Sequence, residues 1–176
     1  MSTLSDMEPE DRGLIIGLLY RAGVWMSHAE DEGGDEDDSR ESKALEKIIS
    51  GLATNKNAPP FVREIARETL NHKKHWPVWE EHSFDILADC EKAVAVLKRT
   101  VSKSDAKGYV IAVRKVAKAV AGAHGEFGEG LPQDSVMDKI KGFLGGQHKV
   151  EDFMNVSPAE EEALQRLAVA LRLGKD

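Results

Sequence analysis

Hydrophobic residues recur every three or four positions along most of this chain, which is the period of an α-helix with one buried face. Runs that alternate apolar and polar residues over the length of a strand are absent. The pattern predicts an all-α fold, a single domain over residues 1–176 built as a bundle of about seven helices. We expect the first helix from residue 9 to about 28–32, and the others at residues 38–54, 61–75, 78–101, 109–125, 134–145 and 157–171.

Local signals predict the ends of several helices. Asp38 with Glu41 three residues later has the spacing of a capping box. We expect Trp76-Pro77 to interrupt the third helix and residues 105–108 to separate the fourth from the fifth. The last helix has the clearest start, because Ser157-Pro158-Ala159-Glu160 joins an N-cap serine, a first-turn proline and a capping glutamate.

Two segments 96 residues apart resemble each other. Ser27-His28-Ala29-Glu30 closes one apolar helical segment, and Ala123-His124-Gly125-Glu126 closes another. Each precedes a glycine-containing loop and a second amphipathic segment, and the apolar spacing that follows agrees to within one residue. This favours two pseudo-repeated helical hairpins, although any two helical hairpins share similar apolar spacing.

The densest charge in the chain lies in residues 28–41, where eight acids accompany one base, Arg40. Clustered carboxylates repel one another, and a bound Ca²⁺ or Mg²⁺ would relieve that repulsion. The EF-hand pattern does not fit, because no aspartate precedes Gly33 or Gly34 at the distance of its first ligand. The alternative is a solvated acidic loop that stabilises the following helix through the helix dipole.

His28 and His124 each lie at a predicted helix C-terminus. A charged imidazole there interacts favourably with the last carbonyl groups, which explains both residues without a ligand. The functional alternative is a paired ligand set that meets across a pseudo-twofold axis and suits a transition metal better than calcium. The candidate ions are Ca²⁺, Mn²⁺ and Zn²⁺, and the candidate metal ligands are His28, Glu30, Asp31, Glu41, His124 and Glu126.

The composition of the chain limits which classes of partner and which cellular location we expect. A net charge of −7 argues against nucleic acid as the main partner. The single cysteine, Cys90, excludes an internal disulfide, and its place on an apolar stripe predicts a core position. With no basic-then-apolar leader and no uninterrupted apolar run long enough to cross a bilayer, we expect a cytoplasmic protein that reaches the inner membrane only through partners.

Other charged and aromatic groups have two interpretations each. Seven bases against one acid in residues 98–118 suit an acidic protein partner or an anionic membrane surface, or complement the acidic loop within the molecule. His72 and His75 have a spacing that allows two metal ligands, but nothing completes a tetrahedral site, so we expect a solvated helix end. Trp76 and Trp79 are expected to be packing anchors rather than a recognition surface.

The sequence contains no nucleophile elbow, Walker loop, dinucleotide fingerprint or paired-histidine zinc motif. We therefore expect a non-enzymatic protein. Two other classes compete with this interpretation. One is a metal-dependent helical hydrolase whose carboxylates and histidines converge in the core, and the other is a pure adaptor with an exposed apolar groove.

The two histidine-containing stretches, with Glu41 after the first and Asp134 or Asp138 after the second, resemble the motifs of the TerB-like family of tellurite resistance. Related domains form the N-terminal region of some membrane-anchored J-domain co-chaperones. The resemblance covers residues 10–150 and leaves residues 151–176 as a C-terminal helix packed on them.

This resemblance implies an all-helical fold with two related hairpins. It also implies a stress-response role through a divalent metal ion or a protein partner near a membrane. The chain departs from the family in two ways: His stands where Asp is usual in both copies, and the first loop is longer and more acidic. The family's metal site is therefore either lost here or built from different ligands.

Overall fold

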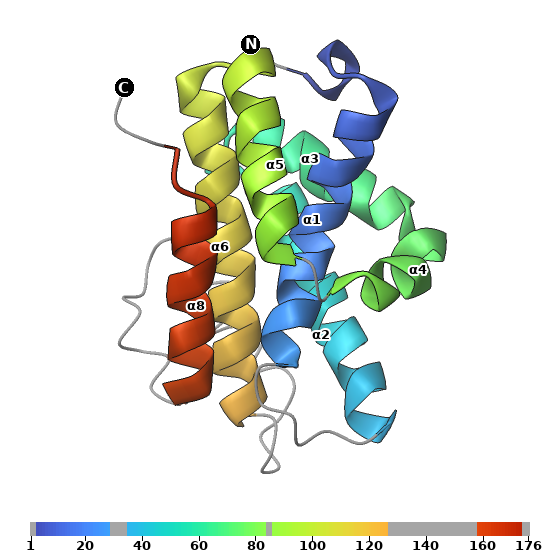
Figure 1. Ribbon diagram of the computed structural model, residues 1–176. Coiled ribbons are helices and arrows are strands. Elements are labelled where there is room, and N and C mark those ends of the chain that lie inside the picture. The colour runs from blue at the N-terminus through green and yellow to red at the C-terminus, as the bar shows by residue number, and fades with distance from the viewer. Residues whose placement is uncertain (1–2, 29–34, 84–85, 127–157, 174–176) are drawn as a thin grey trace.

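The computed structural model describes residues 3–28, 35–83, 86–126 and 158–173, with side chains described except at 35–41 and 122–126. Within these residues the chain forms seven α-helices and no strand, which confirms the predicted all-α fold. Two 3-10 turns, Leu4–Asp6 and Lys73–His75, precede α1 and α4. The helices are α1 Pro9–Ser27, α2 Asp35–Thr54, α3 Pro60–Asn71, α4 Trp76–Glu81, α5 Ile86–Thr100, α6 Lys103–Glu126 and α8 Pro158–Ala170 (Figure 1).

Helix α1 is the central helix, and residues 15–24 of it are buried on all sides. Every residue from 15 to 24 is buried, and the helix contacts α2, α3, α4, α5, α6 and α8. A helix with no polar face is expected inside a core rather than on its surface. In Figure 1, α5, α6 and α8 lie side by side on one side of the bundle, and α2, α3 and α4 lie on the other. The described helices therefore share one hydrophobic core around α1.

Buried hydroxyl groups attach neighbouring helices to the backbone of α1. The Tyr109 hydroxyl of α6 donates to the carbonyl oxygen of Ile15 at 2.9 Å. The Thr69 hydroxyl of α3 lies 2.9 Å from the carbonyl oxygen of Ile16. A buried hydroxyl without a partner costs about 1–3 kcal/mol, so the Tyr109 contact fixes where α6 lies along α1. The Thr69 hydroxyl also lies 2.8 Å from the Ile65 carbonyl oxygen of its own helix, so its contact with α1 adds to the packing of α3 without being its only partner.

The region between residues 61 and 101 differs from its prediction in two places. The helix expected to reach residue 75 ends at Asn71, and Trp76-Pro77 begins α4. Pro77 stands in the first turn of α4, where its missing N–H removes no helical hydrogen bond. The single helix expected over residues 78–101 is two helices, α4 and α5, with the first ending at Glu81. The apolar spacing continues across this corner, so periodicity alone predicted one helix.

Helix α2 begins earlier than predicted. It starts at Asp35, so Asp38 and Glu41 lie inside the helix and do not form the predicted capping box at its start. Carboxylates in a first helical turn are stabilised by the helix dipole, which favours extending the helix into the acidic segment.

Helix α6 also begins earlier, at Lys103, and residues 105–108 are helical rather than a break. The N–H of Asp105 donates to the Ser102 hydroxyl oxygen at 3.1 Å, so Ser102 caps the helix. Gly108 does not form a turn. It lets α6 pack closely against Pro59, because a Cβ at this position would lie 3.3 Å from Cγ of Pro59.

The first and last helices agree with the sequence. α1 covers Pro9–Ser27 and α8 begins at Pro158, as predicted. The helix expected over 134–145 lies outside the described residues, so the pseudo-repeat stays a prediction. One aligned pair of the repeat differs in environment, because Ile15 is 0% exposed and Ile111 is 41% exposed.

Two glycines of α1 provide a matched test of this packing. A Cβ at Gly23 would lie 2.5 Å from Cδ1 of Leu45 and 3.3 Å from Cγ2 of Val120, whereas a Cβ at Gly13 meets nothing within 4 Å. We expect Gly23→Ala to lower the free energy of unfolding by about 1–3 kcal/mol through overpacking. We expect Gly13→Ala to raise it by up to about 1 kcal/mol through helix propensity. Urea denaturation measures both changes, and equal effects of the two variants would contradict the enclosure of α1.

Candidate functional site

The structure places the six sequence-predicted metal ligands unevenly. His28 is the exposed C-cap residue of α1. Glu41 lies in α2, and His124 and Glu126 lie in the last turn of α6, but their side chains are outside the described set, as are Glu30 and Asp31 entirely. Among the residues that are described, no three His, Cys, Asp or Glu side chains gather as a metal cluster. The predicted ligand set therefore stays a prediction.

The two histidine-bearing helix ends do lie at the same end of the bundle. Early in the two helices, Ile15 of α1 contacts Tyr109 of α6. Late in both, Gly23 lies against Val120. The contacts run in the same order, so α1 and α6 are parallel and both end at the bottom of Figure 1, where α2 begins.

A small cavity opens at this end. Its volume is about 60 Å³, which is room for a few water molecules or a small hydrated ion. Ser27 and His28 line it from the end of α1, and residues of α2, α4 and α6 complete the wall. The lining residues are Tyr20, Gly23, Val24, Ser27, His28, Ser42, Leu45, Glu80 and Val120.

The polar lining includes a carboxylic side chain, that of Glu80. The Tyr20 hydroxyl donates to Oε1 of Glu80, and the Ser42 hydroxyl lies 3.4 Å from the same oxygen. Burial, and then the hydrogen bond and negative charge of Glu80, raise the pKa of Tyr20 well above its usual range. Tyr20 is therefore a neutral hydrogen-bond donor at physiological pH.

Glu80 is not among the site residues that the sequence pattern predicts. Its contact with Tyr20 spans 60 residues, and α4 was predicted as part of a longer helix. The WPVWE run in which Glu80 lies marks a helix junction, but nothing in its spacing predicts that this carboxylate faces the end of α1.

A buried ion pair holds the corner between α4 and α5 against α1. Nη2 of Arg21 lies 2.6 Å from Oδ2 of Asp89, with side chains 9% and 19% exposed. Arg21 also donates to the carbonyl oxygen of His82, the C-cap residue that follows the last residue of α4. These contacts explain why the chain turns between α4 and α5 instead of continuing as one helix.

Two further predictions are confirmed beside this pair. Cys90 is fully buried, as its place on the apolar stripe of α5 indicates. Trp76 is a packing anchor: it stacks on Tyr20 with ring centroids 4.3 Å apart, and its indole N–H donates to the carbonyl oxygen of Thr69 at 3.0 Å.

Part of the basic segment of residues 98–118 is engaged within the fold. Arg99 pairs with Asp11 of α1 at 2.8 Å. Partial burial, and then the charge of Arg114, lower the pKa of Lys118. The acidic side chains of residues 30–41 lie outside the described set, so both interpretations of the basic segment stay predictions.

No family model, curated protein or solved structure matches this chain. The resemblance to the TerB-like family therefore rests on the sequence motifs quoted above. Among the described residues, none of the helices combines the length and apolar character needed to cross a membrane.

Removing Asp89 tests the buried pair. We expect Asp89→Ala to lower the free energy of unfolding by about 3 kcal/mol, because Arg21 is then left buried without its anion. Glu162→Ala is the matched control, since Glu162 pairs with Arg166 on the surface of α8 with both side chains more than 60% exposed. An exposed pair contributes less than about 1 kcal/mol. Urea denaturation should separate the variants, and a similar cost for both would contradict the structural role of Arg21.

Because the Cys90 thiol is buried, we expect the free energy of unfolding to fall at high pH. Burial raises the pKa of Cys90 from 9.0 to about 12. Between these values the unfolded chain releases a proton that the folded chain keeps, so stability falls as pH rises, by about 1.4 kcal/mol per pH unit. Denaturation at about pH 8 and about pH 10.5 should show a smaller decline for Cys90→Ala than for the wild-type protein. Identical declines would show that the thiol does not contribute.

Proposed function

We propose that this chain is a non-enzymatic stress-response protein of TerB-like, tellurite-resistance type, which binds a divalent metal ion at the end of the bundle where α1 and α6 end. The observation that carries the proposal is the cavity there, whose lining includes both Glu80 and His28. Hydroxyl oxygens of Tyr20 and Ser42 add polar lining.

The electrostatics of this end favour a cation. Helix C-termini carry partial negative charge on their last carbonyl groups, and both α1 and α6 end here. The acid-rich segment of residues 28–41, which runs from the end of α1 into the first turns of α2, carries the densest negative charge in the sequence. Carboxylate and hydroxyl oxygens suit Ca²⁺ or Mn²⁺, whereas a histidine ligand shifts the preference toward Zn²⁺.

The described residues contribute His28 and Glu80 to this cavity, which is fewer ligands than a tight site needs. The proposal therefore includes the sequence-predicted ligands Glu30, Asp31 and Glu126 as the remaining donors. A protein partner or membrane-surface complex is the second part of the proposed role, and the basic segment of residues 98–118 is the surface suited to acidic groups.

The competing hydrolase would need several histidines and acids to converge with a substrate cavity. His72 and His75 lie instead at the junction of α3 and α4 and do not line the cavity at the end of α1. The cavity of about 60 Å³ is also far smaller than the roughly 300–1,000 Å³ of typical ligand pockets. A bound ion therefore fits this cavity better than a substrate does, while a wider groove of about 520 Å³ beside His82 and Asp89 lies elsewhere on the described surface.

Calorimetric titration with Ca²⁺, Mn²⁺ and Zn²⁺ tests the proposal. We expect sub-millimolar binding of at least one ion, weakened about tenfold or more by Glu80→Gln and by neutralising Glu30, Asp31 and Glu126 together. Glu46→Gln is the matched control, because Glu46 lies on α2 but pairs with Lys73 outside the cavity. Absence of binding at about 1 mM, or equal loss in the control, would refute the metal site and leave the partner role.

A further inference from the structure

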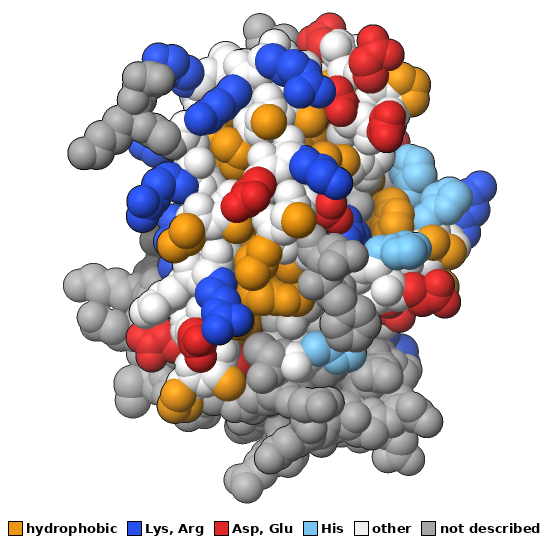
Figure 2. Space-filling view, in the orientation of Figure 1, with side chains coloured by type: hydrophobic (Ala, Val, Ile, Leu, Met, Phe, Trp, Pro, Cys, Tyr) orange, Lys and Arg blue, Asp and Glu red, His pale blue; other side chains and the backbone are white. Residues whose placement is uncertain are grey.

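The junction of α3 and α4 brings two imidazoles and an indole together. α3 ends at Asn71, the 3-10 turn Lys73–His75 follows, and α4 begins at Trp76. The ring centroids of His72 and His75 lie 5.6 Å apart. Both rings lie against Trp79, at 6.4 and 6.3 Å. Figure 2 shows histidine side chains gathered at the right-hand edge of the molecule, near α3 and α4.

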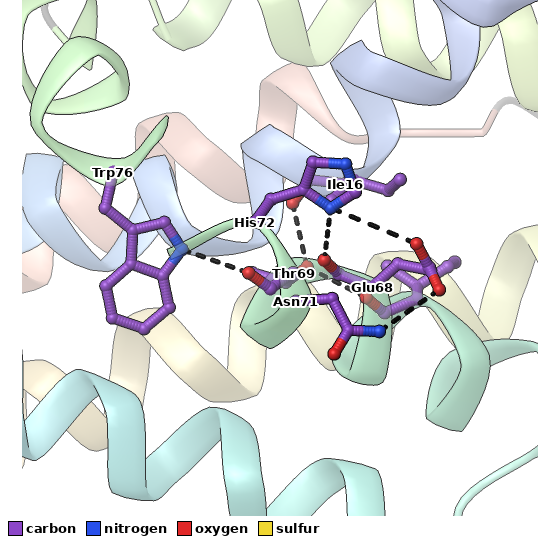
Figure 3. Close-up of polar contacts among 7 residues, drawn as sticks. Ile16, Glu68, Thr69, Asn71, His72 and Trp76 are labelled. Carbon is purple, nitrogen blue, oxygen red and sulfur yellow. Dashed lines mark hydrogen bonds and ion pairs between the residues drawn. The ribbon is translucent and has the colours of Figure 1, made fainter. Parts of the chain in front are cut away.

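The hydrogen bond of His72 determines its tautomer. Nδ1 of His72 lies 2.7 Å from the backbone carbonyl oxygen of Glu68 (Figure 3). A carbonyl oxygen only accepts, so Nδ1 carries the proton and the lone pair of the neutral ring is on Nε2. The Glu68 carboxylate lies 3.9 Å from the same Nδ1. In Figure 3 the other ring nitrogen points away from Glu68.

This arrangement is the one that metal-binding histidines use. Such a histidine donates its second ring N–H to a backbone carbonyl or carboxylate, which orients the ring and makes the ligating nitrogen more basic. Glu68 supplies the carbonyl partner to His72. The ring is also accessible, since the His72 side chain is 39% exposed and His75 is exposed.

The separation of the rings suits one shared ion. With metal–nitrogen bonds of about 2 Å, two imidazoles on one ion have centroids roughly 4.5–6.5 Å apart, depending on the angle between the two bonds. The observed 5.6 Å lies in this range, and His75 is exposed, so its ring can turn about its side-chain bonds without disturbing the core. The carbonyl end of α3 adds partial negative charge beside the pair.

We propose that His72 and His75 form a surface site for a transition-metal ion that prefers imidazole nitrogen, Cu²⁺ most strongly and Ni²⁺ and Zn²⁺ after it. Imidazole suits these ions, and divalent affinity peaks at copper. No third His, Cys, Asp or Glu joins the pair among the described residues, so water completes the coordination. This site is separate from the cavity at the end of α1 and does not depend on the proposed function.

Cu²⁺ titration of the full chain, followed by tryptophan fluorescence, tests the site. Copper bound to the pair lies close to Trp79 and should quench its emission with a saturable curve that fits one ion. His75→Ala should weaken this binding about tenfold or more. His72→Asn should do the same while its amide keeps a donor for the Glu68 carbonyl, and His82→Ala, at the other end of α4, is the matched control that should bind as the wild type does.

Electron paramagnetic resonance of the copper complex gives a second readout. The wild-type protein should show two imidazole nitrogens on the ion, and each histidine variant should show one. Cu²⁺ affinity unchanged in both His75→Ala and His72→Asn would overturn the proposal, as would a loss in His82→Ala as large as theirs. Glu80→Gln should leave the Cu²⁺ affinity unchanged, and His75→Ala should leave the Ca²⁺ and Mn²⁺ affinities unchanged. The proposed histidine site and the proposed cavity site can therefore be refuted independently.

Discussion

The enclosure of residues 15–24 of α1 is the constraint on which the rest of the structure depends. A helix buried over residues 15–24 exposes none of its polar groups to water, so other helices must satisfy them. Arg21 forms an ion pair with Asp89 of α5, and the Tyr20 hydroxyl donates a hydrogen bond to Glu80 of α4. The positions of α4 and α5 around α1 are therefore set by charge and hydrogen bonding as much as by apolar packing.

The same constraint positions the candidate site. α6 packs in parallel along α1, with Gly23 permitting close approach of Leu45 and Val120 near the ends of the helices. Two helix C-termini thus face the same solvent region, and α2 starts there. The Tyr20–Glu80 contact brings α4 to this end, which adds a carboxylate that the local sequence pattern does not predict.

The fold class and several helices were predictable because they depend on local periodicity and capping. Proline at position 158 and the apolar stripe of α1 predicted the two terminal helices correctly. The start of α6 could also have been found, since Ser102 and Asp105 have the spacing of a serine N-cap with an acid at the third helical position.

The corner between α4 and α5 could not be found in this way. It depends on Arg21 reaching the His82 carbonyl 61 residues away, while the apolar spacing continues through it. The candidate site likewise combines a residue that the local sequence pattern predicts with one that it does not predict. His28 at the end of α1 follows from a local pattern, but Glu80 enters the cavity only through tertiary contact. Side chains of the other predicted ligands lie outside the described set, so the sequence remains the basis for them.

The central claim is that the end of the bundle formed by α1 and α6 is where the protein binds a cation. Paramagnetic broadening of amide signals by Mn²⁺, in isotope-labelled full-length protein, tests it most directly. If Mn²⁺ binds in the cavity at this end, the amide signals of Ser27, His28 and Glu80 will broaden before those of α3 and α8. First broadening on α8, or none at about 1 mM Mn²⁺, would contradict it.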